Sequence, residues 1–189
     1  MRIIAGAYKG RTLKTTTGPG FRPAMGKVRE ALFSMLEARG VDWANARALD
    51  LFAGSGSLGF EALSRGAAQV CFVESASYAA KIIAANAEQI GVAPGRVSLR
   101  QEEVAKALSR KAENAYDVIF IDPPYNLDAL GKTLNALIKQ GWALPGCVIN
   151  AEVEAKQPFD PATAHPDLEL LADRSYGQTR VILWNMNRA

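Results

Sequence analysis

From residue 47 onward, short apolar runs alternate with longer stretches in which apolar residues recur every three to four positions. A short apolar run bounded by turn residues is typical of a buried strand, and the longer spacing is typical of a helix with one buried face. Strands are predicted over 47–52, 69–74, 96–101, 117–122 and 146–153, and helices over 57–65, 77–90, 102–113 and 127–139. This alternation predicts βαβ units on a parallel sheet.

The C-terminal end departs from the alternation. Strand-like runs over 168–175 and 179–187 flank Tyr176-Gly177-Gln178, which predicts an antiparallel hairpin. We therefore expect an α/β fold with a mostly parallel, seven-stranded sheet that ends in an antiparallel hairpin.

The N-terminal end is expected to form a small extension of this fold. Residues 1–14 predict a β-hairpin, residues 15–23 a loop, and a helix is expected to follow Pro23 and to end near Arg39. We divide the chain into an extension over 1–23 and a main domain over 24–189, and 189 residues suit one compact domain with such an appendage.

The charge is unevenly distributed along the chain. Its net value is +3, but residues 1–29 hold seven basic residues and no acidic one. A basic segment on a mildly acidic body favours a phosphate-binding arm, and the alternative is a solvated surface. The candidates for contacts to nucleic acid are Arg2, Lys9, Arg11 and Arg22.

The remaining composition narrows the class of protein. His165 is the only histidine, which argues against a Ser-His-Asp hydrolase and a His-rich metal site, so no metal is expected. Cys71 and Cys147 lie in apolar runs and are interpreted as reduced core residues. No apolar run is long enough for a membrane span, and the N-terminus does not resemble a signal peptide, so a cytoplasmic protein without membrane contact is expected.

The run Asp50-Leu51-Phe52-Ala53-Gly54-Ser55-Gly56-Ser57-Leu58-Gly59 predicts a cofactor-binding turn between a strand and a helix. Glycines permit a tight turn and close approach of backbone to ligand. A carboxylate at Asp50 would repel a pyrophosphate and favour the positively charged amino group of S-adenosylmethionine. Glu74 ends the second predicted strand, where it can accept hydrogen bonds from both ribose hydroxyls, or lie as a surface carboxylate. The cofactor candidates are Asp50, Phe52, Gly54, Ser55, Gly56, Glu74 and Glu103, with Glu103 preferred to Glu102 for the adenine amino group.

The residues Asp122-Pro123-Pro124-Tyr125 follow the strand predicted over 117–122. Two prolines cannot continue a sheet, so the chain must turn there and leave Asp122 and Tyr125 at a sheet edge. Asp122 and the Pro123 carbonyl are suited to accept hydrogen bonds from an exocyclic amino group, and Tyr125 to stack on its base. The candidate catalytic residues are Asp122, Pro123 and Tyr125, for methyl transfer to an unpaired or flipped base.

These motifs together resemble the bacterial 16S ribosomal RNA guanine-N2 methyltransferases of the RsmD type over nearly the whole chain. The resemblance is carried by Arg2-Ile3-Ile4-Ala5-Gly6, Lys9-Gly10-Arg11-Thr12-Leu13, Arg22-Pro23, Val28-Arg29-Glu30-Ala31-Leu32-Phe33, Asp50 to Gly59, Glu74 and Asp122 to Tyr125. It implies a Rossmann-like class I fold, S-adenosylmethionine as the methyl donor, and one guanine of 16S rRNA as the acceptor. It also implies that assembled or partly assembled small subunits are the preferred substrate. The run Ala24-Met25-Gly26 departs from the family pattern after Arg22-Pro23.

Other functions stay open at this point. A DNA methyltransferase acting on adenine N6 or cytosine N4 can use the same four-residue motif, although no target-recognition domain is evident. A nicotinamide enzyme fits Gly54, Gly56 and Gly59 but not Asp50. A non-enzymatic RNA-binding module would leave the Asp122 motif without a purpose. We expect a monomer.

Overall fold

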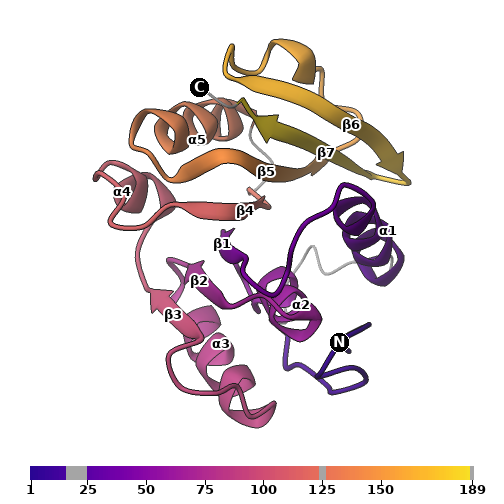
Figure 1. Ribbon diagram of the computed structural model, residues 1–189, viewed down its shortest axis with the longest axis vertical. Coiled ribbons are helices and arrows are strands. Elements are labelled where there is room, and N and C mark those ends of the chain that lie inside the picture. The colour runs from indigo at the N-terminus through magenta and orange to yellow at the C-terminus, as the bar shows by residue number, and fades with distance from the viewer. Residues whose placement is uncertain (16–24, 124–126, 188–189) are drawn as a thin grey trace.

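A computed structural model describes residues 1–15, 25–123 and 127–187 of the chain (Figure 1). Its elements are α1 (Met25–Ala38), β1 (Arg47–Leu51), α2 (Ser57–Arg65), β2 (Gln69–Val73), α3 (Ser77–Gln89), β3 (Val97–Arg100), α4 (Val104–Leu108), β4 (Tyr116–Ile121), α5 (Leu127–Lys139), β5 (Ala143–Glu154), η1 (Pro161–Thr163), β6 (Leu168–Tyr176) and β7 (Thr179–Met186). The predicted seven strands and their C-terminal hairpin are confirmed, with boundaries that mostly differ by one to three residues.

The strands form a single sheet in the order β3-β2-β1-β4-β5-β7-β6. The first five strands run parallel, whereas β7 is antiparallel to both of its neighbours. After β1 the chain builds β2 and β3 on one side, then crosses back to place β4 on the other side of β1. This reversal makes the carboxyl ends of β1 and β4 the switch point, where ligands bind in open α/β sheets.

The two faces of the sheet are covered by different helices (Figure 1). On the first face, α1, α2 and α3 pack on strand residues that include Ala48, Phe72 and Phe120. On the second face, α4 and α5 pack on the alternate residues of the same strands, such as Leu49 and Ile119. Where both faces are covered, the central strands are apolar at nearly every position.

The helix predicted over 102–113 is wrong in length, because α4 ends at Leu108. Two partners distant in sequence hold the residues beyond it in another conformation. The Ala112 N–H donates to the Gln140 carbonyl at 2.9 Å, and the Trp142 indole N–H donates to the Arg110 carbonyl at 3.1 Å. These bonds satisfy backbone groups that a longer helix would have paired internally.

The N-terminal hairpin is smaller than predicted, since its only ladder pair is one antiparallel bridge between Arg2 and Thr12. Most of the loop expected over 15–23 lies outside the described residues. Within the described part of the chain, no helix is both long and apolar enough to cross a membrane.

Candidate active site

The turn after β1 has the backbone that the glycine-rich run predicts. Phe52 has a φ of 58°, Gly54 of 55° and Gly56 of 78°, all in the left-handed region. At Gly56 a Cβ atom would lie 2.7 Å from the Phe60 ring, so this position needs glycine for conformation and for space. A Cβ atom at Gly54 would meet nothing within 4 Å, which leaves room for a ligand to approach the backbone there.

Asp50 is the next-to-last residue of β1 and is only 2% exposed. Its Oδ2 accepts a hydrogen bond from the Gly59 N–H at 2.9 Å, so the carboxylate holds the first turn of α2 against β1. Burial raises the pKa of the Asp50 carboxyl well above its usual range, and the charges of Asp122 and Glu74 raise it further, against the effect of the Gly59 hydrogen bond. The contact of Asp50 with the amino group of a cofactor stays a prediction.

Glu74 follows β2, and its carboxylate links the turn after β1 to the turn after β2. Its Oε2 accepts from the Gly54 N–H at 2.8 Å, and its Oε1 accepts from the Ala76 N–H at 2.7 Å. Each carboxylate oxygen can accept a second hydrogen bond. Glu74 is thus fixed beside the open side of Gly54 with capacity left for hydroxyl donors.

The two glutamates after β3 have different environments. Glu102 forms an ion pair with Arg110 and is mostly covered. Glu103 is exposed and stands at the N-cap of α4 with an extended backbone, and its side chain makes no capping hydrogen bond. The preference for Glu103 as the adenine contact is consistent with these positions but stays a prediction.

Asp122 and Pro123 come directly after β4, beside the end of β1. The Asp122 N–H donates to the Leu51 carbonyl at 3.5 Å, and the Asp122 side chain is exposed while Pro123 is buried. The β4 end therefore stands next to the glycine-rich turn, as the motif predicts. Tyr125 lies outside the described residues, as does Arg22.

Glu152 lies at the same edge of the sheet as Asp122, although the sequence did not mark it as a candidate. In the β4–β5 register Ile121 pairs with Ala151, so Glu152 stands beside Asp122 on the neighbouring strand. Burial raises the pKa of Glu152 from 4.5 to about 8, the charges of Asp122 and Asp50 raise it too, and Arg29 of α1 lowers it. The signal was present as Asn150, Glu152 and Glu154, three polar residues at alternate positions of a strand that is otherwise apolar.

Four carboxyl groups thus act on one another at the carboxyl ends of β1, β2, β4 and β5: Asp50, Glu74, Asp122 and Glu152. Acidic groups this close together favour a cationic ligand, which would stabilise their charged forms, and disfavour a pyrophosphate. S-adenosylmethionine carries a sulfonium and an ammonium group, so the donor set of this edge fits it. Among the described residues, no group of three or more His, Cys, Asp or Glu is arranged to hold a metal ion.

The basic N-terminal segment, residues 1–15, packs on α2 and α3. The Glu61 carboxylate accepts from the backbone N–H groups of Ile4 and Ala5 at 2.8 and 3.1 Å. Asn86 accepts from the Lys14 N–H at 2.8 Å, and a Cβ atom at Gly6 would overlap the Ser64 carbonyl at 1.7 Å. The segment is therefore fitted closely to the surface of these helices.

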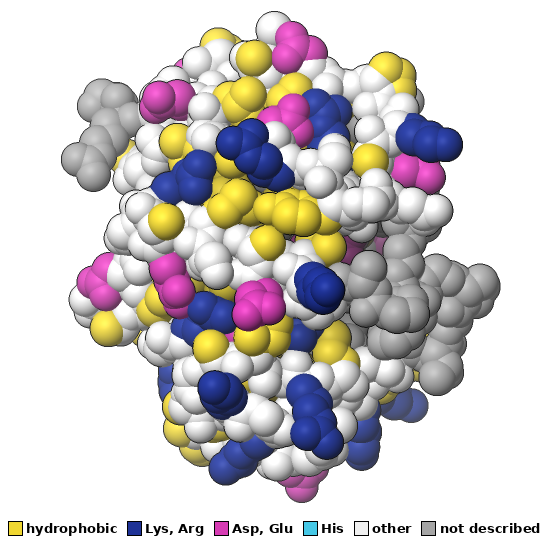
Figure 2. Space-filling view, turned by 90° about the vertical axis from the view of Figure 1, so that its right-hand side faces the viewer, with side chains coloured by type: hydrophobic (Ala, Val, Ile, Leu, Met, Phe, Trp, Pro, Cys, Tyr) yellow, Lys and Arg dark blue, Asp and Glu magenta, His cyan; other side chains and the backbone are white. Residues whose placement is uncertain are grey.

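The candidate RNA contacts of this segment are not equivalent. Arg2 and Lys9 are exposed, and Lys and Arg are the main charged groups on the lower part of the face in Figure 2, at the height of the N-terminal segment. The Arg11 guanidinium is partly engaged, because its Nη1 donates to the Ile90 carbonyl at 2.5 Å and it lies over the Tyr8 ring.

Comparisons with known proteins show the family to which the chain belongs. Residues 1–185 match the model of the family described as Conserved hypothetical protein 95. Ribosomal RNA small subunit methyltransferase D of Escherichia coli is 36% identical over 164 residues, which cover 86% of this chain and 80% of that protein. The protein of the same name from Haemophilus influenzae is 35% identical and covers 84% of this chain and 81% of its own length.

Solved structures place the fold among methyltransferases. An E. coli protein provisionally named a methyltransferase aligns over 100% of this chain and 99% of its own, with a TM-score of 0.85 and 31% identity. The magnesium protoporphyrin IX methyltransferase of Synechocystis, solved with bound S-adenosylmethionine, aligns over 90% of this chain and 87% of its own, with a TM-score of 0.69. At 12% identity the latter shows a shared fold alone.

Proposed function

The chain belongs to the family described as Conserved hypothetical protein 95, and we propose that it methylates the exocyclic N2 of one guanine in 16S rRNA. It is an S-adenosylmethionine-dependent methyltransferase of small-subunit ribosomal RNA with a Rossmann-like fold. The observation that carries the acceptor assignment is the position of Asp122 and Pro123 at the end of β4, beside the glycine-rich turn after β1. When bound, S-adenosylmethionine supplies an electrophilic methyl group.

Asp122 and Pro123 would hold the acceptor amine. The lone pair of a guanine N2 is delocalised into the ring, so the nitrogen is a weak nucleophile until its hydrogen-bond geometry changes. Hydrogen bonds from the amine to the Asp122 carboxylate and the Pro123 carbonyl would favour a more tetrahedral nitrogen and aim its lone pair, an effect of positioning and electrostatics. Asp122 would then take the proton that the methylated amine loses, directly or through water. Tyr125 would stack on the base.

Glu152 supports this role of Asp122. With the pKa of Glu152 raised to about 8, its carboxyl group is mostly protonated at neutral pH and adds no second full charge beside Asp122. A neutral Glu152 lowers the electrostatic cost of a negative charge at Asp122.

The cofactor would lie along the carboxyl ends of β1, β2 and β3. Glu74 would bind the ribose hydroxyls, Asp50 the amino group and Glu103 the adenine. The backbone from Phe52 to Gly56, including Ser55, would line the open side of the turn. The glycine conformations and the fixed Glu74 support this arrangement.

The rRNA would contact the exposed basic residues of the N-terminal segment. Arg2 and Lys9 are oriented to solvent, Arg22 precedes α1, and Arg11 has donors left beyond its bond to Ile90. We further propose that residues 1–23 act as the RNA-binding extension of the domain over 24–189. The protein would act as a cytoplasmic monomer on the small subunit or an assembly intermediate.

One transfer experiment tests the proposal. Purified protein and labelled S-adenosylmethionine are offered unmodified small ribosomal subunits, naked 16S rRNA and duplex DNA, and the product is digested to nucleosides. Label in N2-methylguanosine from the subunits is expected. Label in methyladenine or methylcytosine from DNA alone would replace the acceptor assignment with the DNA alternative.

The Asp122→Ala variant tests the mechanism in the same assay. Transfer should fall by at least two orders of magnitude, because both proton acceptance and amine orientation are lost. Cofactor affinity, measured by calorimetry, should change less than about threefold. An active Asp122→Ala variant would remove this carboxylate from the mechanism.

A further inference from the structure

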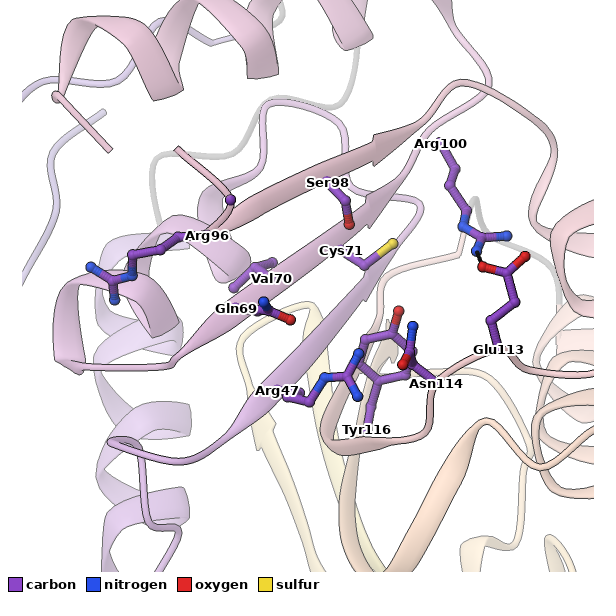
Figure 3. Close-up of a pocket in the computed structure, with 11 residues that line it drawn as sticks. Arg47, Gln69, Val70, Cys71, Arg96, Ser98, Arg100, Glu113, Asn114 and Tyr116 are labelled. Carbon is purple, nitrogen blue, oxygen red and sulfur yellow. Dashed lines mark hydrogen bonds and ion pairs between the residues drawn. The ribbon is translucent and has the colours of Figure 1, made fainter. Parts of the chain in front are cut away.

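The second face of the sheet is open over the amino-terminal halves of β1, β2 and β3. The five residues of α4 form a helix about 7.5 Å long, whereas the four residues of β3 span about 13 Å. The helix is therefore too short to cover the whole length of the strand. The uncovered strand positions are polar, since Gln69 and Ser98 stand where a covered strand would carry apolar side chains. These residues border a cavity of about 290 Å³ (Figure 3).

Arg47 is the main charged group of this cavity. Its Nε is buried without a hydrogen-bond partner in the described part of the chain, and its guanidinium lies 5.5 Å from the centre of the Tyr116 ring. Figure 3 shows the Arg47 side chain extending toward Asn114 and Tyr116. A guanidinium has five N–H donors, and leaving a buried donor without an acceptor is unfavourable. The two terminal nitrogens of the guanidinium carry four further N–H donors, which an acceptor-rich ligand in the cavity would pair.

The neutral groups around Arg47 can all donate hydrogen bonds. Ser98 and Asn114 line the cavity with a hydroxyl and an amide, both of which can donate. Burial, with Cys71 beside it, raises the pKa of the Tyr116 hydroxyl far above neutral pH, so this hydroxyl stays a donor.

Two further arginines define the rim of the cavity. Arg100 adds positive charge there and is paired with Glu113 at 3.3 Å, although the Glu113 side chain is 78% exposed and solvated. Arg96 donates to the Ala67 carbonyl at 2.7 Å, and in Figure 3 it points away from the other labelled side chains. Arg96 therefore fixes the loop before β3, while Arg47 and Arg100 give the cavity its charge.

We propose that this cavity binds a phosphate group, held by the Arg47 guanidinium together with Ser98 and Asn114. Phosphate matches the forked donors of arginine and offers several acceptor oxygens to the neighbouring hydroxyl and amide. The phosphate belongs either to the backbone of the RNA substrate or to a free phosphate ester. Arg47 begins β1 and the glycine-rich turn follows its end, so the site is separated from the reactive edge by the length of that strand, about 16 Å.

The RNA source rests on the proposed function, but the phosphate site does not. The first test is therefore independent of methyl transfer. Inorganic phosphate is titrated into the ¹⁵N-labelled chain at constant ionic strength, and the Arg47 Nε–H resonance is followed by NMR. A saturable shift of that resonance is expected. If the Arg47 resonance does not shift up to a 50-fold molar excess of phosphate over protein, the proposal is overturned.

Two variants identify the residues of the site. Arg47→Gln should weaken phosphate binding at least tenfold. Ser98→Asp should do the same, because it places a negative charge in the cavity at an exposed position. Arg174→Gln is the matched control, since Arg174 is exposed on β6 and lies outside the cavity. If Arg47→Gln fails to fold, Ser98→Asp decides alone, and phosphate binding unchanged in Ser98→Asp refutes the site.

The source of the phosphate is tested with rRNA. If the RNA backbone occupies the cavity, Arg47→Gln should reduce the salt dependence of rRNA binding. The slope of log K against log salt should become shallower by about 0.7 to 0.9, which corresponds to one lost phosphate contact. Arg174→Gln should change this slope less. A slope that Arg47→Gln leaves unchanged, with phosphate binding lost, supports the site and assigns it to a free phosphate ester.

Discussion

Replacing Glu152 by glutamine should make the protein more stable at high pH. In the folded chain the pKa of Glu152 is raised from 4.5 to about 8, chiefly by burial and then by the charge of Asp122. The folded state therefore binds a proton that the unfolded state releases between these two values. Because the unfolded state binds fewer protons there, the free energy of unfolding falls as pH rises through this window and levels off above about pH 8.

The size of the effect follows from the same values. The pKa of Glu152 differs by about 3.5 units between the folded and unfolded chain, and each unit corresponds to about 1.36 kcal/mol. Ionisation of Glu152 therefore lowers the free energy of unfolding by at most about 5 kcal/mol between pH 4.5 and pH 9. Rearrangement of Asp122 and Arg29 around the ionised carboxylate reduces this to a few kcal/mol. Glu152→Gln should abolish the loss, since glutamine keeps the shape and does not ionise.

The assay is urea denaturation of both proteins at intervals from pH 4.5 to 9. The informative quantity is the difference in unfolding free energy between variant and native chain, because other titrating groups, including Asp50, largely cancel in it. That difference should grow with pH in favour of the variant. Glu169→Gln on the exposed side of β6 makes the same chemical change outside the site and serves as the control. A difference that stays constant from pH 4.5 to 9 would refute the interpretation of Glu152 as an acid that is protonated in the folded chain.

Three further outcomes are expected. Glu74→Ala should weaken S-adenosylmethionine binding about tenfold or more in calorimetry, and an unchanged dissociation constant would place the ribose elsewhere. Gly56→Ala should lower the free energy of unfolding by about 1–2 kcal/mol because of its left-handed φ, and by a further 1–3 kcal/mol, roughly, because the new methyl group overpacks against an aromatic ring. Gly54→Ala has open space at its Cβ and should show only the cost of the left-handed φ. The double variant Arg2→Ala, Lys9→Ala should weaken rRNA binding and flatten its salt dependence, and an unchanged slope would exclude these residues from phosphate contacts.

The central part of the fold could be predicted because its signals are local. The apolar runs at β1, β2 and β4 are buried on both faces, so composition alone marks them as strands. The glycines after β1 and the prolines after β4 mark where each strand must turn. Since parallel strands place their carboxyl ends along one edge, these two local signals were sufficient to bring Asp122 beside Gly54.

The parts that could not be predicted depend on partners distant in the chain. The end of α4 is set by the Gln140 carbonyl and the Trp142 side chain, about 30 residues away from the groups that they bond. Glu152 acquires its perturbed pKa from Asp122 and Asp50, which reach it through strand pairing. No periodicity within a window of ten to twenty residues contains these contacts.

The basic N-terminal segment illustrates the same point and changes how its function is understood. From charge alone it was expected to be a phosphate-binding arm, yet it is bound to α2 through Glu61 and to α1 through Arg29, whose Nη2 donates to the Arg2 carbonyl at 2.7 Å. The charge of Arg29 also acts on Glu152 at the reactive edge. The backbone of Arg2 is therefore held in place before RNA arrives, so that a phosphate contact by Arg2 would cost less conformational entropy than one made by a flexible arm. In the proposed function, a fixed separation between Arg2 and Asp122 would then select RNA by shape, as methylation of one guanine among many requires.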